Sequence, residues 1–252
     1  MSRKAIAILG GMGPEASSYM YNSLINLAVS DFGAKNNDQF PEIILHSIPV
    51  PDFISSDKDQ EKSLGMLKKR VQELNKLEIS CLAIACNTAH ILLPDLQKIS
   101  EVPFVSMVDE VLKKVITQKH KTIGILGTPS TLKYKLYQTP LEESGIRVVV
   151  PSEAQIKTLE SMIRNVIAGK LLKSDTQKLL KVADSLKDQG AEAIILGCTE
   201  LPLVFPKKYY LPIFNSTLVL AEALLKKYYH PMKTGGNSMF KGGDNKWQKI
   251  EL

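Results

Sequence analysis

The sequence LAIACNT at residues 82–88 has a counterpart in IILGCTE at residues 194–200. In both stretches a short apolar run, typical of a buried strand, ends at a cysteine, and small polar residues follow Cys86 and Cys198. In parallel α/β sheets, ligands bind at the carboxyl ends of the strands. If these two strand ends face each other, the sequence predicts one thiol on each side of a bound ligand.

Around these two stretches, short apolar runs alternate with amphipathic stretches along most of the chain. This alternation is typical of βαβ units, and it predicts an α/β protein with mainly parallel sheets flanked by helices. The expected strands are Ala5–Leu9, Glu42–Ser47, Cys81–Ala85, Thr122–Leu126, Arg147–Val149 and Ala193–Leu196, with short ones near Val105 and Ile213. The expected helices are Glu15–Val29, Asp59–Leu77, Asp95–Ile99, Val108–Thr117, Thr131–Ser144, Glu153–Ala168, Asp175–Gln189 and Ser216–Tyr229.

The two halves of the chain are similar in pattern. AIAILGG at residues 5–11 is similar to TIGILGT at 122–128, and each segment precedes its cysteine by a similar interval. Gly11 lies 75 positions before Cys86, and Thr128 lies 70 positions before Cys198. A duplication predicts two similar domains related by a pseudo-two-fold axis, with the site in the cleft between them. The alternative is that α/β repeats resemble one another by composition alone.

The expected domain boundaries follow from this repeat. We expect a first domain over residues 1–116 plus 213–230, because the last helix can return to cover the first half. The second domain is expected over residues 117–212. Residues 231–252 contain scattered glycines and charges without periodicity, so we expect a flexible tail there.

Composition narrows the classes of function. The 252 residues are 44% apolar and 23% charged, an ordinary balance for a globular protein. The net charge is +6, but the lysines are scattered over predicted helices, so nucleic acid is not an expected partner. No apolar run reaches about eighteen residues, so no membrane partner is expected. Three cysteines, an odd number, without a signal peptide predict reduced thiols and a cytoplasmic location.

The segment GMGPEA at residues 11–16 fits a loose dinucleotide-binding pattern. However, no acidic residue ends the second expected strand, and no Walker lysine follows the glycines. We therefore interpret the segment as a glycine turn into a helix that starts near Pro14, whose free amides bind a carboxylate as readily as a phosphate. The chain has no CxxC pair and only four histidines, so a metal is not expected, and the glycine pattern does not predict a nucleotide cofactor.

The two cysteines suggest acid/base chemistry at a carbon centre. A thiolate on one side of the ligand can remove a proton while the opposite thiol delivers one, and the roles exchange with the handedness of the substrate. Asn87, Thr88 and Thr199 can orient a bound carboxylate and ammonium by hydrogen bonds. This arrangement inverts a stereocentre.

Glu200, His90 and Cys81 each have a structural interpretation, and Glu200 and His90 also have a functional one. Glu200 either binds the substrate ammonium or positions the Cys198 thiol, or it faces solvent at a helix start. His90 either assists Cys86 or is a capping or core histidine. Cys81, at the start of the strand that ends near Cys86, is most simply a buried core residue on the opposite sheet face.

Three motifs, taken together in order and spacing, resemble the aspartate/glutamate racemase family over about residues 4–229: GMGPEA at 11–16, ACNTAH at 85–90 and GCTEL at 197–201. The resemblance implies two similar α/β domains, a homodimer, and an amino-acid racemase that inverts aspartate or glutamate without pyridoxal phosphate. It makes Cys86 and Cys198 the acid/base thiols. It implies a substrate site lined by Met12, Gly13, Asn87, Thr88, Thr128, Ser130, Thr199 and Glu200.

The chain departs from that family where a substrate side chain is held. The loop PVPDF at residues 49–53 lacks the arginine, and Ala168 stands in place of the lysine, that often bind an acidic side chain. Arg164, one turn earlier, is the nearest possible substitute. A racemase of a non-acidic substrate, a same-fold isomerase or decarboxylase, and a non-catalytic small-molecule binding protein are therefore the alternatives.

Overall fold

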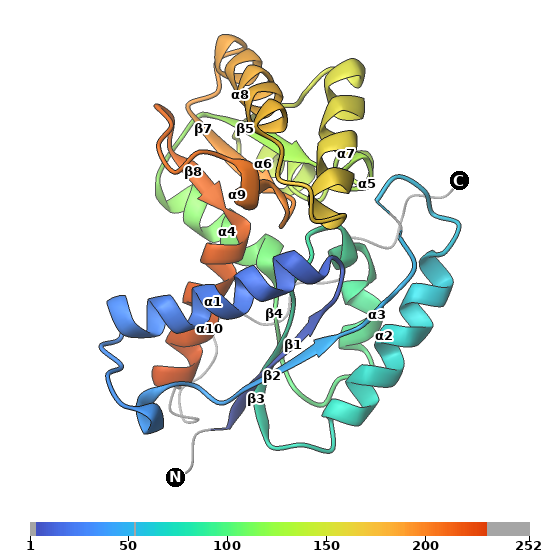
Figure 1. Cartoon of the computed structure of the whole chain (residues 1–252), viewed down its shortest axis with the longest axis vertical. Helices are drawn as coiled ribbons and strands as arrows, with labels where there is room; N and C mark the ends of the chain where they lie inside the picture. The colour runs from blue at the N-terminus through green and yellow to red at the C-terminus, as the bar shows by residue number, and fades with distance from the viewer. Residues whose placement is uncertain (1–3, 53, 231–252) are drawn as a thin grey trace.

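The computed structural model describes residues 4–52 and 54–230, and it contains two four-stranded sheets in which all paired strands are parallel (Figure 1). The first sheet has the order β2-β1-β3-β4, and the second has the order β6-β5-β7-β8. The two orders correspond strand by strand, as expected of a duplication. The predicted α/β class is confirmed, whereas the predicted tail at 231–252 lies outside the described residues.

The strands agree closely with the sequence prediction. Those of the first sheet are β1 (Ala5–Gly10), β2 (Ile43–Ser47), β3 (Ile79–Ile84) and β4 (Phe104–Val105). Those of the second are β5 (Thr122–Gly127), β6 (Arg147–Val149), β7 (Ala193–Gly197) and β8 (Ile213–Asn215). The central strands β1, β3, β5 and β7 are mostly apolar, and nearly all their residues are buried, as expected where helices cover both faces of a parallel sheet.

Helices pack on both faces of the first sheet. Helices α1 (Pro14–Ser30) and α10 (Ser216–Tyr229) lie on one face, where Ile6 and Ile8 point. Helices α2 (Gln60–Leu74) and α3 (Leu93–Gln97) lie on the other. Cys81 is fully buried on the α1 side and Cys86 lies on the α2 side, so the predictions for Cys81 are confirmed.

The second sheet is covered in the same way. Helices α7 (Glu153–Ile167), α8 (Lys173–Asp188) and α9 (Leu201–Val204) pack on one face. Helices α4 (Met107–Thr117), α5 (Pro129–Lys133) and α6 (Gln138–Glu143) pack on the other. Two short 3-10 helices, η1 (Asn37–Gln39) and η2 (Thr88–Leu92), complete the described elements. Within the described ranges, no helix has the length and apolar character needed to span a membrane.

The last helix of each half covers the sheet of the other half. Helix α4 follows β4 of the first sheet, yet its apolar residues pack in the core of the second sheet. Helix α10 follows β8 of the second sheet and packs in the core of the first (Figure 1). The division into residues 1–116 with 213–230 and residues 117–212 stays a prediction. The packing at the two predicted boundaries does not follow this division. Helix α4 belongs to the predicted first domain but lies on the second sheet, and β8 belongs to the predicted first domain but pairs with β7 of the second sheet.

The single helix predicted over residues 131–144 is wrong. The structure has two short helices, α5 and α6, with a break at residues 134–137. The side chain of Thr128 accepts the N–H of Thr131 and so begins α5 before the predicted start. Lys135 adopts a positive φ of 51°, which interrupts the helical path. The amphipathic pattern extends across the break, so sequence periodicity alone does not reveal it.

This break brings Tyr137 into the interior, where its side chain is fully buried. The Tyr137 hydroxyl donates to Oδ1 of Asn87, and Asn87 Nδ2 donates to Oγ of Ser216 at 3.0 Å. The Ser216 hydroxyl in turn donates to the carbonyl of Leu196 at 2.8 Å. This chain of hydrogen bonds joins the end of β3 to the second sheet and to the start of α10.

His90 connects the end of β3 to the start of α4. Its Nδ1 lies 2.8 Å from the carbonyl oxygen of Cys86, and its Nε2 lies 3.0 Å from the backbone nitrogen of Met107. Because the Met107 N–H can only donate, Nε2 is the acceptor and the proton is on Nδ1. Burial lowers the pKa of His90 to about 4, so the ring is neutral at physiological pH. The interpretation of His90 as a core histidine describes this arrangement.

We predict that Tyr137→Phe destabilises the protein. The variant keeps the ring but leaves Oδ1 of buried Asn87 without the Tyr137 donor, which costs about 1–3 kcal/mol of unfolding free energy. Urea unfolding at pH 7 measures this loss. The matched control is Tyr21→Phe, at an exposed tyrosine of α1, which should change the free energy by less than about 0.5 kcal/mol. Equal effects of the two substitutions would contradict the assigned hydrogen bond.

We predict that His90 makes stability pH-dependent between its folded pKa of about 4 and the ordinary value of 6.5. In that window the unfolded chain binds the additional proton, so the stabilising contribution is complete above pH 6.5 and is lost towards pH 4. His90→Gln should reduce the slope of unfolding free energy against pH by up to about 1.4 kcal/mol per pH unit. Urea unfolding at several pH values tests this, with His46→Gln on β2 as control. An unchanged slope in His90→Gln would contradict it.

Candidate active site

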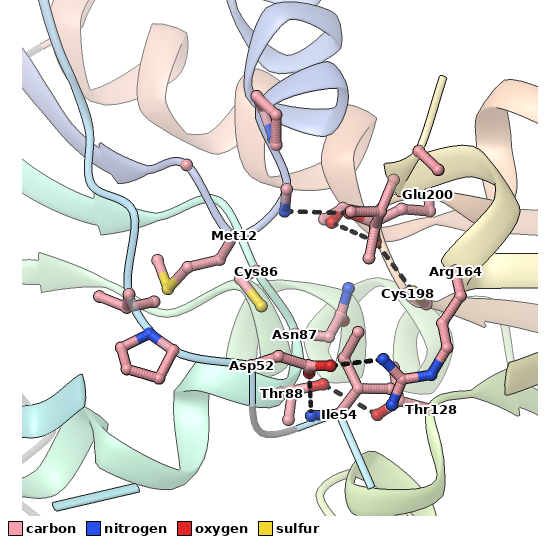
Figure 2. A pocket seen from close by; sticks show the side chains of 18 residues that line it. Met12, Asp52, Ile54, Cys86, Asn87, Thr88, Thr128, Arg164, Cys198 and Glu200 are labelled. Atoms are coloured by element: carbon pink, nitrogen blue, oxygen red, sulfur yellow. Dashed lines mark hydrogen bonds and ion pairs between the residues drawn. The ribbon is translucent and has the colours of Figure 1, made fainter. Parts of the chain in front are cut away.

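A cavity of about 280 Å³ lies where strand ends from both sheets meet (Figure 2). Cys86 enters it directly after β3, and Cys198 enters it directly after β7. The volume is at the small end of the range for small-molecule pockets, which is about 300–1,000 Å³. The two thiols that the sequence singles out therefore line the same cavity.

All but one of the site residues predicted from the sequence line this cavity. Those in the lining are Met12, Gly13, Cys86, Asn87, Thr88, Thr128, Cys198, Thr199 and Glu200. The exception is Ser130, which is buried outside the lining. Its backbone N–H donates to the carbonyl of Ile54 at 2.9 Å, so it fastens the loop after β2 to the second half.

Cys86 lies at the start of η2. The backbone N–H groups of Thr88 and Ala89 are directed at its sulfur and favour the thiolate. Burial has the opposite and larger effect, and the Glu200 carboxylate adds to it, so the pKa of Cys86 is raised to about 12. This cysteine is therefore a neutral thiol at physiological pH.

Glu200 is buried, with 4% of its surface exposed, so the interpretation as a solvent-facing residue is wrong. Its Oε2 accepts a hydrogen bond from the Cys198 thiol at 3.0 Å and another from the Thr199 hydroxyl at 3.1 Å. Its Oε1 accepts the backbone N–H of Gly13 at 3.1 Å. Burial, and then the charge of Glu200, raise the pKa of Cys198 well above its ordinary value. Cys198 is thereby held as a proton donor.

Two backbone N–H groups in the turn before α1 are already engaged within the protein, whereas the sequence predicts free amides at this helix start. The Gly11 N–H donates to Oγ of Ser17 at 2.8 Å, and the Gly13 N–H donates to Glu200. The carboxylate at this helix start therefore belongs to the protein itself. Gly11 has a φ of 89°, and a Cβ there would lie 2.3 Å from the backbone nitrogen of Ile48, so the turn requires glycine.

The hydroxyls at the base of the cavity are connected across the two halves. Oγ1 of Thr88 lies 2.8 Å from Oγ1 of Thr128, and Thr128 donates to Oγ1 of Thr131 at 2.9 Å. With the Tyr137–Asn87 hydrogen bond, these contacts hold the cavity wall in one arrangement. Sequence reasoning missed Tyr137 because its role depends on the break between α5 and α6.

Two charged lining residues were not among the predicted sites. Asp52 follows β2, and Arg164 lies on α7; their side chains form an ion pair at 2.5 Å across the cavity (Figure 2). The sequence signal for the arginine is its position one helical turn before Ala168, where the related family often has a lysine. Arg164 also forms an i,i+4 ion pair with Glu160 at 2.9 Å. Within the described ranges, no cluster of three potential metal-binding side chains is present.

Several known proteins are similar to this chain in sequence and in fold. The broad-specificity amino-acid racemase RacX of Bacillus subtilis is 27% identical, over 88% of this chain and 97% of its own length. A Pyrococcus horikoshii aspartate racemase homologue is 28% identical with a TM-score of 0.74, over 90% of this chain and 99% of that one. Picrophilus torridus aspartate racemase is 25% identical with a TM-score of 0.78, over 90% and 94%.

The match to a family model extends through both halves. The model that describes Asp/Glu/hydantoin racemases matches residues 9–224, which include both cysteines and the whole cavity lining. The named relatives are racemases, which are isomerases. This chain belongs to the Asp/Glu/hydantoin racemase family, and it is a racemase.

Proposed function

We propose that this racemase inverts the α-carbon of an amino acid with Cys86 and Cys198 as its two acid/base groups, and that it uses no cofactor. The observation that carries the proposal is the shared cavity, which two thiols enter from equivalent strand ends of two sheets. Groups that arrive from different sheets can act on different faces of one small molecule. The broad specificity in the name of the Bacillus subtilis relative supports a reaction that is not tied to one side chain.

In the proposed reaction, one thiolate removes the α-proton and leaves its electron pair on the substrate carboxylate as an enolate. The opposite thiol then donates its proton to the other face of the same carbon. One C–H bond and one S–H bond break, and one of each forms. The enzyme ends with the first cysteine as the thiol and the second as the thiolate. The reverse reaction begins from that exchanged state, and proton transfer of this kind contributes about 10²–10⁴-fold in rate.

The surroundings of the two sulfurs support different starting roles. Cys198 donates a hydrogen bond to Glu200, which suits the acid, whereas Cys86 faces two backbone N–H groups, which suits the base. Both thiols have raised pKa values, with burial as the largest cause. A bound α-ammonium adds a positive charge beside them and favours the thiolate. The substrate itself thus promotes the ionisation that its own reaction requires.

A cytoplasmic location and a homodimer complete the proposal. The free state of Cys81, Cys86 and Cys198 supports a reducing compartment, where thiol catalysis persists. The family resemblance supports a dimer. Sedimentation velocity of the purified chain distinguishes a dimer from a monomer.

We predict that Cys86→Ser and Cys198→Ser each reduce racemisation by about 10²–10⁴-fold, because each removes one of the two proton-transfer groups. Chiral chromatography of single amino acids, without added cofactor, measures this loss. The matched control is Cys81→Ala, at the buried core thiol outside the cavity, which should keep its racemase activity.

The same two variants should also differ from each other. Each retains one thiol, so each should exchange the α-proton of only one enantiomer with deuterated water, and the two should prefer opposite enantiomers. A variant that racemises at the normal rate would contradict the two-thiol proposal. It would favour a one-thiol reaction, such as that of a same-fold isomerase or decarboxylase.

We predict that Glu200→Gln lowers the pKa of both cavity thiols, because the carboxylate raises the pKa of Cys86 and of Cys198. Alkylation of these two cysteines by iodoacetamide at pH 8 should accelerate about tenfold, which corresponds to a shift of about one pKa unit. Mass spectrometry at a series of pH values measures the alkylation rate of each thiol. Glu192→Gln, at an exposed carboxylate of the second half, is the control. Coincident pH profiles for wild type and Glu200→Gln would rule out this role.

A further inference from the structure

The charged groups of the cavity fall into two sets. Glu200 accepts a hydrogen bond from the Cys198 thiol, whereas Asp52 and Arg164 form an ion pair with each other in the lining (Figure 2). Arg164 is the only lysine or arginine among the described residues that line the cavity. A negatively charged side chain of a substrate could therefore form an ion pair in this lining only with the Arg164 guanidinium.

That guanidinium already has acidic partners from both halves. Nη1 of Arg164 donates to Oδ2 of Asp52, while Nη2 and Nε donate to Oε1 of Glu160 at 2.9 and 3.0 Å. Nη2 also donates to Oγ of Ser55 at 3.0 Å. A substrate carboxylate needs two parallel N–H groups for a bidentate contact, and it can obtain them here only by displacing Asp52 or Glu160.

Electrostatics also oppose an acidic side chain. Asp52, Glu160 and Arg164 together carry a net charge of −1, and Glu200 adds another negative charge elsewhere in the lining. A further carboxylate beside Asp52 would meet like charge without an unpaired cation to offset it. Four lining residues that are close to the pair in sequence are apolar and suit an uncharged side chain: Val50, Ile54, Ile167 and Ala168.

We propose that Asp52 occupies Arg164 in place of a substrate carboxylate, so that the site rejects aspartate and glutamate and accepts amino acids with uncharged or cationic side chains. This inference rests on the proposed racemase function and names its substrate class. Among the possibilities left by the sequence, it favours a non-acidic substrate over the acidic one that the family resemblance implies. Asp52 is then the specificity-determining residue.

The first test compares the wild-type enzyme on single substrates. L-methionine, L-lysine, L-aspartate and L-glutamate are supplied separately, and kcat/KM for the opposite enantiomer is measured by chiral chromatography. We expect methionine or lysine to exceed both acidic substrates at least tenfold. If aspartate or glutamate matches or exceeds them, the specificity inference is overturned while the proposed function stands. If no amino acid is racemised or exchanges its α-proton, the proposed function fails instead.

The second test removes the charge of Asp52, which is one of the two acidic partners of Arg164. Asp52→Asn removes the competing charge but keeps the size of the side chain. The ratio of kcat/KM for aspartate to that for methionine should rise about tenfold, which corresponds to about 1.4 kcal/mol of differential binding in the transition state. The Asp52–Arg164 pair is half-exposed and contributes little to stability, so the variant should fold. The double variant Asp52→Asn with Arg164→Met should lose the gain.

The same loop provides a matched control. Asp57 also pairs across to the second half, with Lys133 at 2.6 Å, but it does not line the cavity. Asp57→Asn should leave the aspartate-to-methionine ratio unchanged. An unchanged ratio in Asp52→Asn, or an equal rise in Asp57→Asn, would overturn the assignment of specificity to Asp52.

Discussion

The structure of the site depends on one buried carboxylate. Glu200 accepts the backbone N–H of Gly13 from the first half and the thiol proton of Cys198 from the second. A buried carboxylate is stable only where hydrogen-bond donors surround it, so these contacts hold the glycine turn and the cysteine in one arrangement. The same charge raises the pKa of both cavity thiols. One side chain thus joins the two halves and adds to the effect of burial, which is the larger cause of the raised pKa of both thiols.

The two helices that pack on the sheet of the other half hold the elements around Glu200 in place. Helices α4 and α10 each leave one sheet and pack in the core of the other, so the two halves cannot separate without exposing apolar surface. The hydrogen bonds from Tyr137 through Asn87 to Ser216 run beneath the cavity in the same region. Acid/base groups on opposite faces of a carbon need fixed spacing, and packed elements maintain it better than loops.

The sequence predicts the features that depend on local pattern. Apolar runs identify the central strands, and the strand ends identify Cys86 and Cys198, because both signals lie within a few residues. Contacts between distant segments are a different matter: Gly13 with Glu200, Asp52 with Arg164, and Tyr137 with Asn87. A single sequence carries no record of which polar groups meet across a cleft. For that reason the sequence predicts free amides at the start of α1, whereas the Gly13 N–H already donates to Glu200.

The central claim is that two thiols act on opposite faces of one α-carbon. The most direct measurement follows the α-hydrogen when a single enantiomer is racemised in deuterated water, at early times, by mass spectrometry of the separated enantiomers. If two thiols act, deuterium appears in the newly formed enantiomer and protium stays in the remaining substrate, because the acid thiol has exchanged with solvent before it donates. Product that retains the substrate's own α-proton would show that one group moves it between faces, and it would contradict the account.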